Sequence, residues 1–255
     1  MKTRSLISKL YSYYPKSIAE YYEDYVGLMV GKFKEDTKKI LLCLDFDETI
    51  FLETLEYRPD LIITHHPFFY GLKSEILKED KHKADLYKML NKYELTIFSL
   101  HTNFDGGNPG MNDALAKALD LKDIYGIEDD YCIRIGTLEK EMKIDEFAQY
   151  VKQKFNIPYA MLLNYGSKKI KKVGIVGGGG SSDFKLAQKE GCDIYISGDV
   201  PHYIRRDIVI NKMNYLDVPH EVERIFMPTL KEVLLDIDPS LDIKIIDHEK
   251  LPKIV

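Results

Sequence analysis

Short apolar runs alternate along the chain with stretches in which apolar residues recur at helical spacing. Apolar runs of roughly four to eight residues, bounded by polar residues, Gly or Pro, are typical of buried strands, and the longer periodic stretches are typical of helices that pack on a sheet. This alternation predicts an α/β protein with largely parallel or mixed sheets. Histidine-bearing polar loops follow strands in both halves, so we expect two similar α/β lobes with mixed sheets that face a shared cleft.

The predicted strands are 39–45, 60–66, 94–101, 132–140, 159–164, 171–177, 192–199, 214–218 and 241–247. The predicted helices are 3–13, 16–26, 48–57, 83–93, 111–121, 144–155, 184–191, 201–212 and 219–236. The acidic, Gly-containing stretch 119–131 is the expected boundary. Lobe I then comprises 1–125, completed by the C-terminal helix and strand of 226–255, and lobe II comprises 126–225.

The composition is that of a globular protein without a membrane span. The chain has 255 residues, of which 45% are hydrophobic and 30% charged, as in a globular protein of one large or two smaller domains. It has no apolar run long enough to span a membrane and no signal-peptide core, and its three cysteines are widely spaced, which favours reduced thiols in the cytoplasm. The net charge of -5 gives no electrostatic reason to expect nucleic acid as a partner.

The segment THHPFFY, residues 64–70, carries the strongest indication of chemistry. His65 and His66 stand where a buried strand ends, and Pro67 stops that strand. Strand-end loops of open α/β sheets are common ligand sites, and imidazole is a common ligand for transition metals. The alternative is that one histidine caps the strand and the other is solvated.

Two more strand ends carry metal-binding residue types. SLHTNFDGG, 99–107, supplies His101 and Asp105, and the carboxylate is suited to bridge two cations, although a local turn role would also account for it. NYLDVPHEVERIF, 214–226, places His220 and Glu223 three residues apart at the start of a predicted helix, on one face. The alternative for these two residues is that His220 is a capping histidine and Glu223 a solvated glutamate. Together the three loops supply nitrogen and oxygen donors for two cations.

Two further loops have competing interpretations. Gly177–Gly180 follows a strand and precedes a helix, which suits either anion binding by free amides or a tight packing turn, and it fits neither standard nucleotide fingerprint. LLCLDFDETI, 41–50, resembles the nucleophile loop of haloacid-dehalogenase phosphatases, with Asp45 as nucleophile. The required downstream pair of aspartates is missing, so we prefer a strand followed by an acidic helix cap formed by Asp45 or Asp47.

The combination of DLIITHHPFF, HTNFD with PGMNDALA, the GGGGSS loop, ISGDVPHY and PHEVER resembles the Nif-three-like dinuclear metal-centre family, type 2 homologues of GTP cyclohydrolase I. The resemblance implies metal ligands at His65, His66, Asp105, His220 and Glu223. The family places its late glutamate four residues after the histidine, whereas Glu223 follows His220 by three, with Pro219 in place of the usual Gly. Glu221 is a weaker candidate than Glu223 for this ligand position. The resemblance also implies a toroidal homohexamer of two-lobed subunits.

From this site we expect a metal-dependent hydrolase that uses two divalent ions, Zn, Fe or Mn, on a small nucleotide or related heterocycle. His101 and His202 are the candidate proton shuttles, because imidazole titrates near neutral pH. The name of the family suggests GTP as substrate. A non-catalytic metal-binding or interaction scaffold is the alternative from another class, and the phosphatase is the third.

Overall fold

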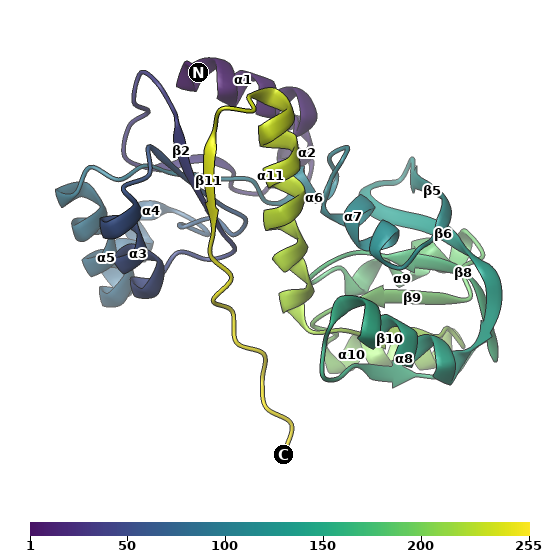
Figure 1. The fold of residues 1–255 in the computed structure, drawn as a ribbon. Coiled ribbons are helices and arrows are strands. Elements are labelled where there is room, and N and C mark those ends of the chain that lie inside the picture. Colours follow the sequence, from purple (N-terminus) through teal and green to yellow (C-terminus); the bar gives the residue numbers. More distant parts are fainter. The chain divides into compact units, whose positions relative to one another are not determined.

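The computed structural model describes residues 1–255, which form two compact units (Figure 1). Unit 1 contains residues 1–108 and 226–249, and unit 2 contains residues 109–225 and 250–255. The chain returns to unit 1 at Phe226, the residue at which we placed the C-terminal part of lobe I. The first division lies at 108/109 rather than at 125/126, and the last six residues fall in unit 2.

The helix that follows this division explains the difference. Helix α7 (Met111–Ala118) packs against strands β5 (Lys122–Ile127) and β6 (Asp130–Lys143) of unit 2. Arg134 of β6 donates from Nε to Asp113 Oδ1 of α7 over 2.6 Å. The acidic stretch expected to be a linker is therefore a strand, and its packing assigns α7 to unit 2.

Unit 1 is a five-stranded sheet between two layers of helices (Figure 1). Its strands are β1 (Gly27–Val30), β2 (Lys39–Cys43), β3 (Leu61–Thr64), β4 (Ile97–Ser99) and β11 (Asp242–Ile245), in the order β1-β4-β3-β2-β11. Its helices are α1 (Thr3–Tyr13), α2 (Lys16–Tyr21), α3 (Glu48–Tyr57), α4 (Lys73–Glu79), α5 (Lys81–Lys92), the single turn α6 (Thr102–Asp105) and α11 (Phe226–Ile237).

The strands β4, β3, β2 and β11 are parallel to one another, and only β1 at the edge is antiparallel. The central strands are buried on both faces, so Leu61, Ile62 and Ile63 form one continuous apolar run instead of an alternating pattern. Helices α3 and α5 bury Phe51, Leu86 and neighbouring residues against one face of this sheet. Parallel order brings the carboxyl ends of four strands to one edge.

Unit 2 is built on a six-stranded mixed sheet in the order β5-β6-β8-β9-β10-β7. The remaining strands are β7 (Met161–Leu163), β8 (Lys169–Ile175), β9 (Ile194–Ser197) and β10 (Tyr215–Asp217). The remaining helices are α8 (Ile144–Phe155), α9 (Phe184–Lys189), α10 (His202–Ile210) and the 3₁₀ turns η1 (Ser181–Asp183) and η2 (His220–Ile225). Strands β8, β9 and β10 are parallel neighbours, so their carboxyl ends also meet at one edge.

The structure bears on the cysteines and on the question of a membrane-spanning helix. The cysteines Cys43, Cys132 and Cys192 are buried and form no disulfide. Burial raises the pKa of Cys192 to about 12, so this thiol is protonated at neutral pH. None of the helices combines the length and the apolar composition needed to cross a lipid bilayer.

Candidate metal centre

The carboxyl ends of β3 and β4 position the histidines of unit 1. These strands are parallel neighbours, and Thr64 pairs with Ser99, the last residue of β4. The chain leaving β3 therefore presents His65 and His66 beside His101, which follows β4. A ring nitrogen of each of these three histidines lies within 4.8 Å of the others, as in a group that can hold a metal ion. We call these three residues the histidine cluster.

Asp105 lies next to the histidine cluster because the HTNFD segment forms α6, a single helical turn. The Asp105 amide donates to His101 O over 3.0 Å, which closes this turn. Its carboxylate Oδ1 then lies 3.6 Å from His65 Nε2. The ring of His65 is fully buried and packs on Phe226, with 5.0 Å between the ring centroids. The helical turn thus adds a largely buried carboxylate to the three imidazoles.

Each histidine of the cluster uses its Nδ1 to contact an oxygen. The contacts are His65 Nδ1 with Leu100 O at 2.9 Å, His66 Nδ1 with Asp45 Oδ2 at 2.7 Å, and His101 Nδ1 with Asp24 Oδ2 at 2.7 Å. A carbonyl or an ionised carboxylate only accepts, so Nδ1 carries the hydrogen and the lone pair is on Nε2. Metal-binding histidines are typically oriented in this way.

Asp24 is the partner that the sequence pattern did not single out. It lies in the loop after α2, far from His101 in sequence, and its side chain is 2% exposed. Its Oδ2 also accepts hydrogen bonds from the amide and the hydroxyl of Thr102. Burial opposes ionisation of Asp24, but the hydrogen bonds from His101 and Thr102 outweigh it and lower the pKa of this carboxyl. Asp24 therefore remains an anion that fixes the ring of His101.

The two aspartates after β2, Asp45 and Asp47, have different roles. Asp47 is the N-cap of α3, since its Oδ1 accepts from the Ile50 amide over 3.0 Å. Asp45 does not cap this helix and instead accepts from His66. Because β2 is the parallel neighbour of β3, the end of β2 delivers a carboxylate to the back of the His66 ring.

In unit 2, His220 and Glu223 form a second group of donor atoms. His220 Nδ1 lies 2.5 Å from Asp199 Oδ2, and His220 Nε2 lies 2.9 Å from Glu223 Oε2. Asp199 follows β9 and His220 follows the neighbouring β10, so the carboxyl edge of this sheet again supplies both groups. His220 and Asp199 also line a cavity of about 320 Å³.

The spacing of three residues between His220 and Glu223 follows from local structure. We expected an α-helix from 219, but residues 220–225 form the 3₁₀ turn η2, and the α-helix α11 begins at Phe226. A 3₁₀-helix has three residues per turn, so positions i and i+3 are aligned along its axis. This conformation brings the glutamate, rather than Arg224, into line with the histidine. Glu223 is 3% exposed, whereas Glu221 is more exposed.

The glycine loop packs against this pair. Gly178 has φ of +60°, and a Cβ built on it would lie 2.1 Å from Glu223 Oε1 and 3.2 Å from His220 Cε1. The Gly178 carbonyl accepts from the Gly198 amide over 2.7 Å, and the Gly177 amide donates to Asn112 Oδ1 over 2.7 Å. These contacts are those of the packing turn, the second of the two interpretations of the loop.

The two candidate proton shuttles lie in different surroundings. His101 belongs to the histidine cluster and is held by Asp24, whereas His202 is the exposed first residue of α10 in unit 2. His101 is therefore a candidate ligand of unit 1 as well as a candidate shuttle.

The donor set fits a divalent transition metal. Imidazole nitrogens with carboxylate oxygens suit Zn, Fe and Mn, whereas Ca²⁺ and Mg²⁺ favour oxygen ligands alone. Unit 1 supplies three such nitrogens and the Asp105 carboxylate, and unit 2 supplies His220 with Glu223.

Comparison with known proteins identifies the family of this chain. Residues 1–252 match the family model described as Duf34/NIF3 (NGG1p interacting factor 3). The chain is 32% identical over 229 residues to a Clostridium perfringens protein named GTP cyclohydrolase 1 type 2 homolog, with 86% of each chain covered.

Solved structures share the fold at lower identity. A Bacillus cereus protein related to NIF3 superposes with a TM-score of 0.87 at 20% identity, over 100% of this chain and 99% of that chain. The Staphylococcus aureus protein SA1388 superposes with a TM-score of 0.86 at 24% identity, with the same coverage. At these identities the likeness shows the fold alone. The family model spans nearly the whole sequence, and the chain therefore belongs to the DUF34/NIF3 family.

Proposed function

We propose that the protein is a metal-dependent hydrolase that acts on a nucleotide or related heterocycle. The observation that carries the proposal is the histidine cluster, which lies next to Asp105. Each of its three histidines contacts an oxygen through Nδ1, and this contact leaves the lone pair of the ring on Nε2. His65, His66 and Asp105 would hold two divalent ions together with His220 and Glu223 from unit 2. We further propose that the protein is a cytoplasmic homohexamer.

The chain's own residues have distinct roles in this proposal. Two bound divalent ions would supply an acidified water and polarise the substrate. Asp105 would supply a carboxylate ligand, and the oxygens of Asp45 and Leu100 keep His66 and His65 in the tautomer that would bind metal. His101 or His202 accepts the proton released during attack. GTP is the first substrate to test, because relatives carry the name GTP cyclohydrolase 1 type 2 homolog.

Turnover by metal-loaded protein tests this function. A panel of nucleotides that includes GTP is incubated with wild-type protein, with Asp105→Ala and with Asp85→Ala, whose exposed carboxylate pairs only with Lys88 of the same helix. We expect hydrolysis of at least one nucleotide by the wild type and by Asp85→Ala, and none by Asp105→Ala. Anomalous scattering should give two peaks about 3.5–4 Å apart.

Two other outcomes separate the alternatives. Bound metal without turnover of any substrate above the Asp105→Ala level would favour a metal-handling or interaction scaffold. Phosphatase activity that is lost in Asp45→Asn but kept in Asp105→Ala would favour the haloacid-dehalogenase alternative. The contact of Asp45 with His66 supports an orienting role for this residue instead.

A further inference from the structure

Two exposed tyrosines lie beside the histidine cluster. The ring centroid of Tyr70 is 5.9 Å from that of His101, with the planes at 82°, and the Tyr25 ring is 6.1 Å from the Tyr70 ring. Tyr70 is 67% exposed and Tyr25 is 42% exposed. We call these two residues the tyrosine pair. Neighbouring exposed aromatic rings beside a polar cluster are typical of a binding surface rather than of a protein core.

The segments that carry the tyrosine pair also hold the cluster. Tyr25 directly follows Asp24, which fixes His101. Tyr70 ends the segment that begins with the two adjacent histidines, after Phe68 and Phe69, which are 3% and 4% exposed. The buried Phe68 and Phe69 rings anchor this segment, 4.8 Å apart. The backbone positions of both tyrosines are therefore set by the residues that build the candidate metal centre.

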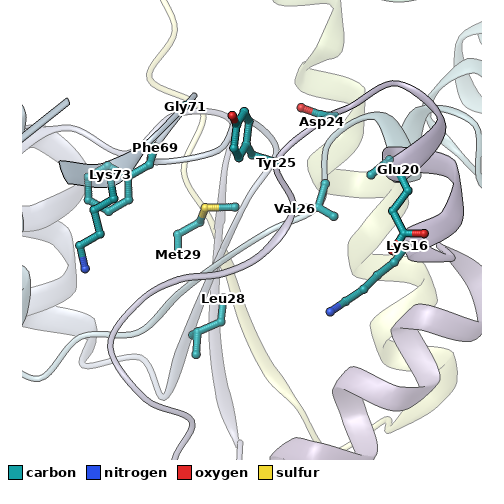
Figure 2. Close-up of a pocket in the computed structure, with 11 residues that line it drawn as sticks. Lys16, Glu20, Asp24, Tyr25, Val26, Leu28, Met29, Phe69, Gly71 and Lys73 are labelled. Atoms are coloured by element: carbon teal, nitrogen blue, oxygen red, sulfur yellow. The ribbon is translucent and has the colours of Figure 1, made fainter. Parts of the chain in front are cut away.

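A cavity of about 420 Å³ adjoins the pair, and Tyr25 is part of its wall. Figure 2 shows Tyr25 above Met29 and Val26, with Phe69 on one side and Lys16 and Glu20 on the other. Gly71 and Phe69, the two neighbours of Tyr70 in sequence, line the same cavity. Its volume lies within the usual range for a pocket that accepts a small organic ligand. The wall combines apolar and aromatic side chains with four charged residues, Lys16, Glu20, Asp24 and Lys73, so it suits a ligand that has both a flat ring and polar groups.

We propose that the tyrosine pair positions the planar heteroaromatic ring of the substrate next to the histidine cluster. This inference rests on the proposed function and adds two residues that determine specificity for a planar ring. The ring of the ligand packs on Tyr70 and Tyr25, which places its edge at His101, and the remainder of the ligand extends toward the cavity. Aromatic faces accept any base, so the pair selects for a ring and leaves the choice among bases to other contacts.

Binding of nucleosides to the full-length, metal-loaded protein tests the inference. Guanosine, adenosine and uridine serve as ring probes without phosphate, and ribose 5-phosphate serves as the ring-free control, all measured by isothermal titration calorimetry. Removing one stacked aromatic ring typically weakens binding of a base by roughly ten-fold or more. We expect such a loss for Tyr70→Ala and for Tyr25→Ala, near-wild-type affinity for Tyr70→Phe, and no change in ribose 5-phosphate binding.

The controls separate positioning from structural damage. Tyr165→Ala removes another tyrosine that is 52% exposed, on unit 2, and should leave nucleoside affinity unchanged. Elemental analysis should show the same metal content in Tyr70→Ala as in the wild type. The inference is overturned by nucleoside affinity that survives in Tyr70→Ala, by the absence of nucleoside binding to the wild type, or by a changed native mass of Tyr70→Ala, which would assign the pair to a subunit interface.

The inference and the proposed function fail in different ways. Tyrosine-dependent nucleoside binding by a protein that hydrolyses nothing would reject the hydrolase and keep the binding site. Nucleotide hydrolysis with equal kcat/KM in wild type and Tyr70→Ala would keep the hydrolase and reject the role of the tyrosine pair.

Discussion

Two carboxylates, Asp24 and Asp45, stand behind histidines of the cluster and differ in exposure. Asp24 is almost fully buried, whereas the Asp45 side chain is 53% exposed. A carboxylate that accepts from Nδ1 raises the basicity of the ring and fixes its orientation, so its loss typically weakens metal binding. Because Asp45 is exposed, its replacement tests this orienting effect with little change in the core.

For Asp45→Asn we expect metal affinity to fall about 10- to 100-fold, with the free energy of unfolding of the metal-free protein changed by less than about 0.5 kcal/mol. Competition with a chromophoric chelator measures the affinity. Asp47→Asn is the matched control at the end of the same strand, because it alters the N-cap of α3 and leaves the contact with His66 in place. Equal metal affinities in the two variants would contradict the role given to Asp45.

Asp183 predicts a pH dependence of stability. Burial, followed by the nearby Asp130 carboxylate, raises the pKa of Asp183 from 3.8 to about 6. The folded state therefore binds this proton more tightly than the unfolded state, and the stability it contributes is present below the unfolded pKa and is lost as pH rises through the folded pKa.

Asp183→Asn should unfold in urea with nearly wild-type free energy at about pH 4 and become progressively more stable than the wild type toward about pH 7. The upper bound of the gain is roughly 3 kcal/mol, from a shift of about two pKa units. Urea titrations across this range measure the difference. A difference that stays constant with pH would show that the carboxyl does not titrate as described.

Residue types at strand ends identified most of the candidate ligands, because ligand sites of open α/β sheets lie at the carboxyl ends of the strands. His65, His66, His101 and Asp105 were all visible in this way. Asp24 was not, since its contact with His101 depends on how the loop after α2 folds back, and no local pattern encodes that path.

At the scale of elements, the turn η2 and the glycine loop act together on one glutamate. The 3₁₀ conformation aligns Glu223 with His220, and Gly178 leaves room for the carboxylate. Any side chain at Gly178 would occupy the position of Glu223 Oε1 and would also need a backbone conformation that favours glycine.

We therefore expect Gly178→Ala to lose most of its metal affinity and to be destabilised by about 1–3 kcal/mol. Gly179→Ala is the matched control one residue away, because a Cβ there would meet nothing within 4 Å. Metal content after dialysis and the midpoint of thermal unfolding report the two effects. Retention of metal by Gly178→Ala at the wild-type level would refute the packing argument.

Long periodic elements were predictable, and short ones were not. Helices α1, α3 and α8 begin and end where the apolar spacing placed them, since each has a clear buried stripe. Strand β1 and the turns α6 and η2 were missed or assigned another type, because a stretch of four to six residues carries too little periodicity. The elements that shape the candidate site are among these short ones.

At the scale of the whole molecule, the proposed homohexamer predicts a native mass close to six times the 29.6 kDa of one chain. Sedimentation equilibrium of metal-loaded and metal-free protein measures this mass directly. A monomeric or dimeric mass at micromolar concentration would refute the hexamer. Such a result would leave the donor groups within each unit unaffected, because they are formed inside one chain.

Unit 1 is discontinuous in sequence, and this has a consequence for synthesis on the ribosome. Phe226 packs on the ring of His65, and β11 pairs with β2, so two segments made last complete the unit that contains the histidine cluster. Residues 109–225 of unit 2 lie between the two parts of unit 1 in sequence and are synthesised before Phe226. The nascent chain must therefore hold the first 108 residues in an incomplete state until residues 226–245 have been synthesised, and only then is the packing around the histidine cluster complete.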